Sequence, residues 1–97
     1  MIDSLIAIIR EAAAEIRPEL AEAIDRQGTE TVLFGPDGHV DSLGLVTLVA
    51  AVEREIEERF DAFVILADER AMSRAKSPFR TVGTLAEYAA ERIQEEG

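Results

Sequence analysis

Apolar residues recur at intervals of three and four positions along residues 2–24, 43–60 and 82–94, and this spacing restricts the fold more than any other feature. It places most apolar side chains of each stretch on a common face of a helix. No stretch shows a convincing alternation of apolar and polar residues, although residues 60–66 are apolar enough to resemble a strand. The sequence therefore predicts an all-α fold, a small bundle of three long helices and one short helix.

The first apolar stretch is interrupted by a proline. Pro18 lacks a backbone N–H and disfavours helical geometry at the residue before it, Arg17. We expect either a kink or two helices that abut near Arg17, with the second helix fading by Arg26.

Two less regular stretches separate the predicted long helices. Residues 27–41 contain three glycines and a proline, which predicts a loop. A loop of this length needs buried contacts of its own, and we expect its anchors in the core to be Val32, Leu33, Phe34 and Val40. The second stretch, residues 61–80, is predicted to hold the short helix, around residues 68–76, before Ser77-Pro78 ends it.

The last helix is predicted from about Val82 to Gln94. Thr81 or Thr84 is expected to cap it, and residues 84–87 have the spacing of a capping box. Its inward face is expected to consist of Leu85, Tyr88, Ala89 and Ile93.

Length and charge exclude several classes of protein. A chain of 97 residues has room for a single domain, residues 1–97, with one modest core. Twenty acids against 10 bases argue against binding to nucleic acid or to an anionic membrane surface. Without cysteine there is no disulfide and no thiolate metal site. No segment approaches the ~18 apolar residues of a membrane span, so we expect a soluble, cytoplasmic protein.

The central helix is predicted from Leu43 to about Phe60, with Asp41 or Ser42 as its N-cap. Its core face is Leu45, Leu48, Val49, Val52, Ile56 and Phe60. A second apolar face carries Leu43, Val46 and Ala50, and continues into Glu53 and Glu57. Periodicity leaves two interpretations open: neighbours cover this helix on two sides, or the second face binds a basic partner.

Ser42 lies at the junction of the loop with this helix. The unpaired N–H groups and the positive dipole of a helix start favour a phosphate there. An Asp-Ser pair before an apolar run is also an ordinary N-cap, and the local pattern alone favours that simpler interpretation.

The wider pattern resembles an acyl carrier protein. The likeness lies in a long first helix, a loop with glycine and proline, and Val-Asp-Ser-Leu-Gly-Leu-Val at residues 40–46. The ending Phe-Arg-Thr-Val-Gly-Thr-Leu-Ala-Glu-Tyr at residues 79–88 is similar to the entry of that family's last helix. The resemblance covers nearly the whole chain and implies an acyl-carrier-like bundle.

The resemblance implies that Ser42 carries 4′-phosphopantetheine, bound covalently and donated by coenzyme A. A phosphopantetheinyl transferase with Mg²⁺ would attach it. The arm ends in a thiol that holds acyl or aminoacyl groups as thioesters, and acyl-loading and acyl-processing enzymes would act on them. On this reading the chain is a stand-alone monomeric carrier and not an enzyme. The partner-binding residues implied by the likeness are Asp41, Leu43, Val46, Ala50, Glu53 and Glu57.

Three features depart from a typical fatty-acid carrier. Gly44 and Thr47 stand where such carriers often have acids. The stretch between the central and last helices is longer than usual. It also includes a basic segment, Arg70, Arg74, Lys76 and Arg80. We interpret this segment as a solvated helix face, and the alternative is a second contact site for a partner. These departures suggest a specialised lipid or secondary-metabolite pathway.

Other residues that resemble chemical sites receive simpler interpretations. His39 is interpreted as a turn residue, because no third group is evident to orient it as a base. Asp3-Ser4-Leu5 repeats the modification tripeptide without the preceding loop, and we interpret it as a helix cap. The alternative function is an unmodified acidic adaptor that binds one protein through the face from Leu43 to Glu57.

Overall fold

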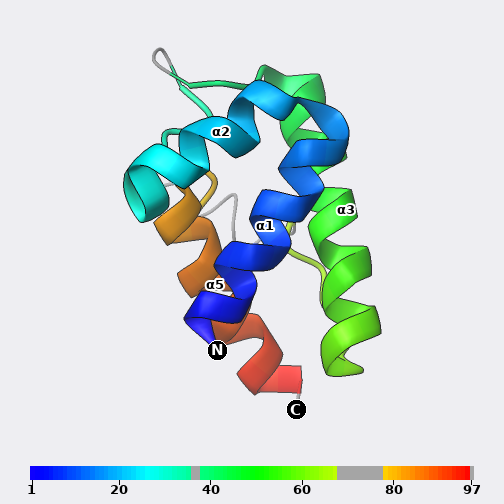
Figure 1. The fold of residues 1–97 in the computed structure, drawn as a ribbon. Helices are drawn as coiled ribbons and strands as arrows, with labels where there is room; N and C mark the ends of the chain where they lie inside the picture. Colours follow the sequence, from blue (N-terminus) through cyan, green and yellow to red (C-terminus); the bar gives the residue numbers. More distant parts are fainter. Residues whose placement is uncertain (36–37, 68–77, 97) are drawn as a thin grey trace.

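The computed structural model describes residues 1–35, 38–67 and 78–96. Its helical elements are α1 (Ile2–Ile16), α2 (Pro18–Gln27), the 3₁₀ turn η1 (Gly28–Glu30), α3 (Ser42–Phe60) and α5 (Val82–Glu96). α1 packs against α2, α3 and α5, and Figure 1 shows it between α3 and α5 with α2 crossing one end. The prediction of a small all-α bundle is confirmed. The predicted short helix over residues 68–76 lies outside the described residues.

The predicted interruption at Pro18 is a complete break between two helices. Arg17 adopts an extended backbone, with φ −152° and ψ 101°, and Pro18 becomes the first residue of α2. This is the conformation that a residue before proline prefers. The chain therefore turns sharply at Arg17, and α2 lies across the end of the bundle where α3 begins (Figure 1).

The caps of the helices differ in part from those expected. α5 begins at Val82, and Thr81 and Thr84 cap it together: the Thr84 N–H donates to Thr81 Oγ1 at 3.1 Å, and the Thr81 N–H donates to Thr84 Oγ1 at 3.0 Å. The capping box predicted at residues 84–87 is wrong, because Thr84 already lies in the first turn. The cap predicted at Asp3-Ser4-Leu5 is also wrong, since Met1 is the N-cap of α1.

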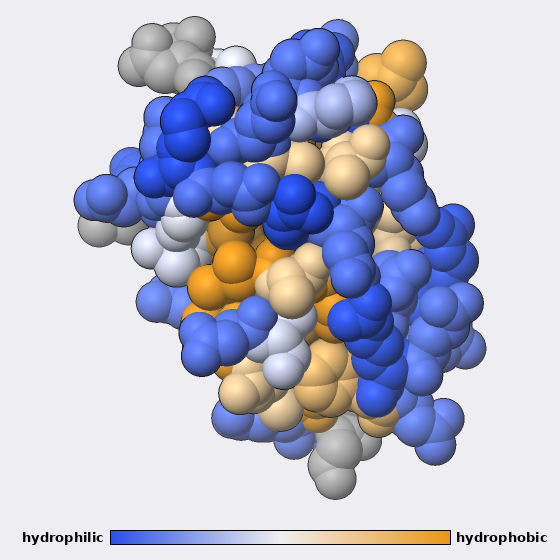
Figure 2. All heavy atoms as spheres, in the orientation of Figure 1, coloured by the Kyte–Doolittle hydropathy of each residue, from blue (hydrophilic) through white to orange (hydrophobic). Residues whose placement is uncertain are grey.

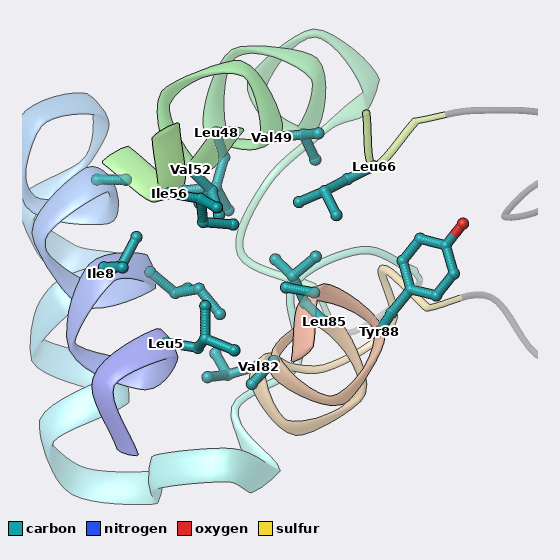
Figure 3. Packing of buried hydrophobic residues seen from close by; sticks show 14 of the residues in the cluster. Leu5, Ile8, Leu48, Val49, Val52, Ile56, Leu66, Val82, Leu85 and Tyr88 are labelled. Atoms are coloured by element: carbon teal, nitrogen blue, oxygen red, sulfur yellow. The ribbon is translucent and has the colours of Figure 1, made fainter. Parts of the chain in front are cut away.

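The core forms where α1, α3 and α5 face one another. Figure 3 shows their side chains converging, with Leu66 joining from the segment after α3 and the Tyr88 hydroxyl pointing away from the cluster. The predicted inward face of α5 is buried throughout. On α3 the predicted core face is confirmed, with Leu45 and Phe60 partly buried and the other four residues buried.

The segment after α3 runs back along the bundle. Asp61 ends the helix in the left-handed conformation, with φ 52°, and its N–H donates to Glu57 O at 3.0 Å. Side chains then alternate: Ala62, Val64 and Leu66 are buried, and Phe63 and Ile65 are exposed.

The side of the molecule seen in Figure 1 is covered mostly by hydrophilic residues, and Figure 2 shows a smaller apolar area over the middle of this side, where α1 lies beside α5. No helix among the described ranges combines the length and the apolar character needed to cross a membrane.

Candidate functional site

Ser42 is the first residue of α3, and its side chain is exposed. The loop that leads to it folds back on itself. The Val40 N–H donates to Leu33 O at 3.0 Å, and the His39 N–H donates to Val32 O at 3.3 Å. These hydrogen bonds support the backbone just before Ser42, at the junction of the loop with the helix.

A second set of hydrogen bonds joins this loop to the entry of α5. The Leu33 N–H donates to Arg80 O at 2.7 Å, and the Val82 N–H donates to Thr31 O at 3.0 Å. Val32 and Thr81 form an antiparallel bridge between them. Sequence reasoning missed this pairing, although the run Thr-Val-Leu-Phe at residues 31–34, with two β-branched residues and one aromatic residue, is the signal that indicates it.

The predicted loop anchors are confirmed in part. Leu33 and Val40 are buried, whereas Val32 is half-buried and Phe34 keeps 36% of its surface exposed. The loop turns at Gly38, where an added Cβ would lie 2.5 Å from Leu33 O. No other residue fits this close approach without moving the backbone.

Arg17 fixes the other side of the loop. Its Nη1 donates to His39 O at 3.2 Å, which ties the break between α1 and α2 to the segment just before Ser42. No sequence pattern predicted this contact. His39 takes part through both its backbone N–H and its backbone carbonyl, in agreement with its interpretation as a turn residue.

Asp41 is the N-cap of α3. Its Oδ1 accepts a hydrogen bond from the Gly44 N–H at 2.7 Å, one of the donors that a helix start leaves unpaired. A Cβ at Gly44 would lie 3.2 Å from both Asp41 Oδ1 and the Cβ of Val40. The glycine that costs helix propensity therefore lets α3 begin close against the loop.

Two hollows of different chemistry meet at Ser42. The Arg17 hollow, about 440 Å³, is lined by Ser42 together with Arg17, Phe34, Gly35, Gly38, His39, Val40 and Asp41. The apolar groove, about 390 Å³, is lined by Ser42 together with Phe34, Leu45, Val46, Val49, Ala50, Glu53, Ala67 and Phe79. A third hollow of about 580 Å³, between Thr29 and Arg80, does not include Ser42.

The second apolar face of α3 is open. Leu43 is 76% exposed and Val46 is 63% exposed, and Ala50 and Glu57 are exposed as well. No residue that the structure describes covers Leu43 or Val46, which contradicts the interpretation in which neighbours cover α3 on two sides. Glu53 is half-buried, and its Oε2 accepts the Leu66 N–H at 2.6 Å, so this carboxylate has a structural partner within the chain.

The structure describes one residue of the basic segment. Arg70, Arg74 and Lys76 lie outside the described residues, and Arg80 is exposed beside the start of α5. Its two interpretations stay open. Among the side chains that the structure describes, no three His, Cys, Asp or Glu residues gather in a way that would hold a metal ion.

Comparisons of the chain with models of known families, with curated proteins and with solved structures found no match. The features that bear on function are therefore the residues around Ser42 and the sequence pattern that contains them.

Proposed function

We propose that this chain is a stand-alone acyl carrier protein, which bears 4′-phosphopantetheine on Ser42 and presents acyl thioesters to partner enzymes. The observation that carries the proposal is the position of Ser42. Ser42 is exposed at the start of α3, where the hollow lined by Arg17 meets the apolar groove. The arm has a charged phosphodiester, which suits the Arg17 hollow, and a long chain that ends in the cargo, which suits the apolar groove.

The site fits attachment of such an arm. Ser42 is exposed to an approaching transferase, while Asp41 and the hydrogen-bonded loop hold its backbone. When attached, the arm supplies a reactive thiol, which this cysteine-free chain does not contain. The chain's own contribution is to hold the attachment point and to offer surfaces to the arm and to partner enzymes.

The apolar groove suits the alkyl chain of an acyl cargo. Apart from Ser42, the lining is apolar except for Glu53, whose carboxylate already accepts the Leu66 N–H. An alkyl chain in the groove would gain roughly 0.8 kcal/mol for each CH₂ group that it buries.

Partner enzymes would dock on the exposed face of α3. Leu43, Val46 and Ala50 supply apolar contact next to Ser42, and Glu57 continues the same face with negative charge. A basic surface on the partner would be attracted by this carboxylate and by the net charge of −10. Gly44 and Thr47 make the top of the face less negative than in typical fatty-acid carriers, which favours a dedicated partner of a specialised lipid or secondary-metabolite pathway.

The same open face supports one alternative, an unmodified acidic adaptor that binds a single protein from Leu43 to Glu57. Intact-mass measurement separates the two functions. The protein is incubated with coenzyme A, Mg²⁺ and a phosphopantetheinyl transferase of broad specificity. A carrier gains the mass of one phosphopantetheine group, and Ser42→Ala abolishes the gain.

Ser4→Ala is the matched control, because Ser4 also follows Asp and precedes Leu and is exposed on a helix. It is expected to gain the full mass. A gain that survives Ser42→Ala would contradict attachment at Ser42. No gain with several transferases would favour the adaptor.

A further inference from the structure

The Arg17 hollow contains one arginine, and this arginine differs from others on the helices. Arg10 pairs with Asp25 at 2.7 Å, Arg54 lies 3.6 Å from a glutamate of α1, and Arg59 contacts two glutamates. In the part of the chain that the structure describes, Arg17 has no carboxylate partner. Among the described residues, Arg26 and Arg80 also lack a carboxylate partner, but neither lines a hollow that includes Ser42.

The local structure also orients Arg17 toward the loop before Ser42. Its extended backbone lies at the break between α1 and α2, and its Nη1 donates to His39 O at 3.2 Å. Within the described ranges this is the hydrogen bond that the guanidinium makes, so Nε and Nη2 are available to another acceptor. A guanidinium offers parallel donors that match the oxygens of a phosphate group.

We propose that Arg17 binds the phosphodiester of the group carried on Ser42, and that it is a positioning residue for the arm. The inference rests on the proposed function, and adds where the charged part of the arm lies. The diester is bonded directly to Ser42 Oγ, so the tether keeps it at the mouth of the hollow that Arg17 lines. The arm would then continue toward the apolar groove.

The charges around Ser42 favour placing the phosphodiester in the Arg17 hollow and not in the apolar groove. The apolar groove has Glu53 as its charged lining residue, which repels an anion. The Arg17 hollow also contains an acid, Asp41, but unlike the groove it offers an anion the guanidinium of Arg17. Arg17 is the positively charged side chain that shares a hollow with Ser42, and the ³¹P environment of the arm should therefore depend on it.

The test compares the holo forms of the wild type and of three variants, Arg17→Gln, Arg17→Lys and Arg26→Gln. Arg26 is the matched control, because it is exposed on α2 and lines neither hollow at Ser42. The ³¹P resonance of the diester is recorded between low and high NaCl, and unfolding in urea is measured for the apo and holo forms.

We expect Arg17→Gln to shift the ³¹P resonance and to remove most of its dependence on salt, with Arg17→Lys intermediate and Arg26→Gln unchanged. Arg17→Gln should also raise the unfolding equilibrium constant of the holo form about two- to fivefold more than it raises that of the apo form, as expected for loss of an exposed ion pair. If Arg17→Gln does not fold, the intermediate response of Arg17→Lys decides.

A purely structural role predicts a different result. The bond to His39 O is present in the apo form, so its loss would destabilise the apo and holo forms equally and leave the ³¹P resonance unmoved. That outcome would overturn the inference. Failure of the proposed function is a separate result, because the wild-type protein would then gain no mass and give no ³¹P signal.

Discussion

Glu53, which lines the groove beside Ser42, accepts the Leu66 N–H through its Oε2 at 2.6 Å. This hydrogen bond ties the segment of residues 61–67 to α3. It also means that Glu53, predicted on the partner-binding face, has a role inside the domain. The acidic end of the open face is then carried by Glu57.

Loss of the Glu53 carboxylate should loosen residues 61–67. Glu53→Ala leaves the Leu66 N–H without its acceptor, and we expect the free energy of unfolding to fall by about 1–3 kcal/mol. Glu53→Gln keeps an oxygen acceptor and should lose less. Urea unfolding measures the change, and hydrogen exchange at the Leu66 amide locates it. Equal stability of Glu53→Ala and the wild type would show that this bond contributes nothing.

Two positions on α3 should separate partner binding from folding. Val46→Asp places a charge on an exposed position, so the free energy of unfolding should stay within about 0.5 kcal/mol. Leu48→Ala empties a fully buried position and should cost about 2–5 kcal/mol. Acyl transfer to or from a partner enzyme should weaken in Val46→Asp, because apolar contact is lost. Unchanged transfer would remove Val46 from the docking face.

Gly38 should not tolerate a side chain. Ala at this position would bring its Cβ to 2.5 Å from Leu33 O, and the loop before Ser42 would have to shift. We expect Gly38→Ala to lose about 1–3 kcal/mol of unfolding free energy and to slow attachment of the arm. Gly28→Ala is the comparison variant. Nothing lies within 4 Å of its added Cβ, so this substitution introduces backbone strain from the positive φ but no steric clash.

Acid should weaken the contact between α1 and α2. Hydrogen bonds from Arg10, at 2.7 and 2.9 Å, lower the pKa of Asp25 below its ordinary value. Because the folded pKa is lowered, the stabilisation is fully present above about pH 3.9 and is lost as the pH falls through the folded pKa. Asp25→Asn should therefore flatten the melting-temperature profile below about pH 4.

The control for this profile is Glu22→Gln, an exposed carboxyl on the same helix. Its profile should keep the acid-dependent loss seen in the wild type. An Asp25→Asn profile that falls as steeply as the wild type would show that the pair with Arg10 does not contribute to stability in acid.

Helical periodicity was enough to predict the bundle, because one apolar face per helix leaves few ways to pack. The break at Pro18 and the inward face of α5 followed from the same local rules. Helix caps were predicted less well. Whether Thr81 or residues 84–87 cap α5 depends on the direction from which the preceding chain enters this helix. That entry is set by pairing with residues 31–33, which are distant in sequence.

The candidate site was predicted at Ser42 and on the face of Leu43, Val46 and Ala50, whose exposure the structure confirms. Its surroundings were not predicted. The contact from Arg17 to His39 O and the contact from Glu53 to the Leu66 N–H both join residues far apart in the chain. Sequence periodicity predicts neither contact, because each is a hydrogen bond between one side chain and one backbone atom.

The pairing of residues 31–33 with residues 80–82 has a consequence for the order of events during synthesis. Thr31 O and the Leu33 N–H find their partners in Val82 and Arg80, which leave the ribosome long after Ser42 does. A nascent chain that ends within α3 has the serine but lacks the two backbone hydrogen bonds that join its loop to the entry of α5. Maturation at Ser42 should therefore favour chains translated through the start of α5 over shorter ones.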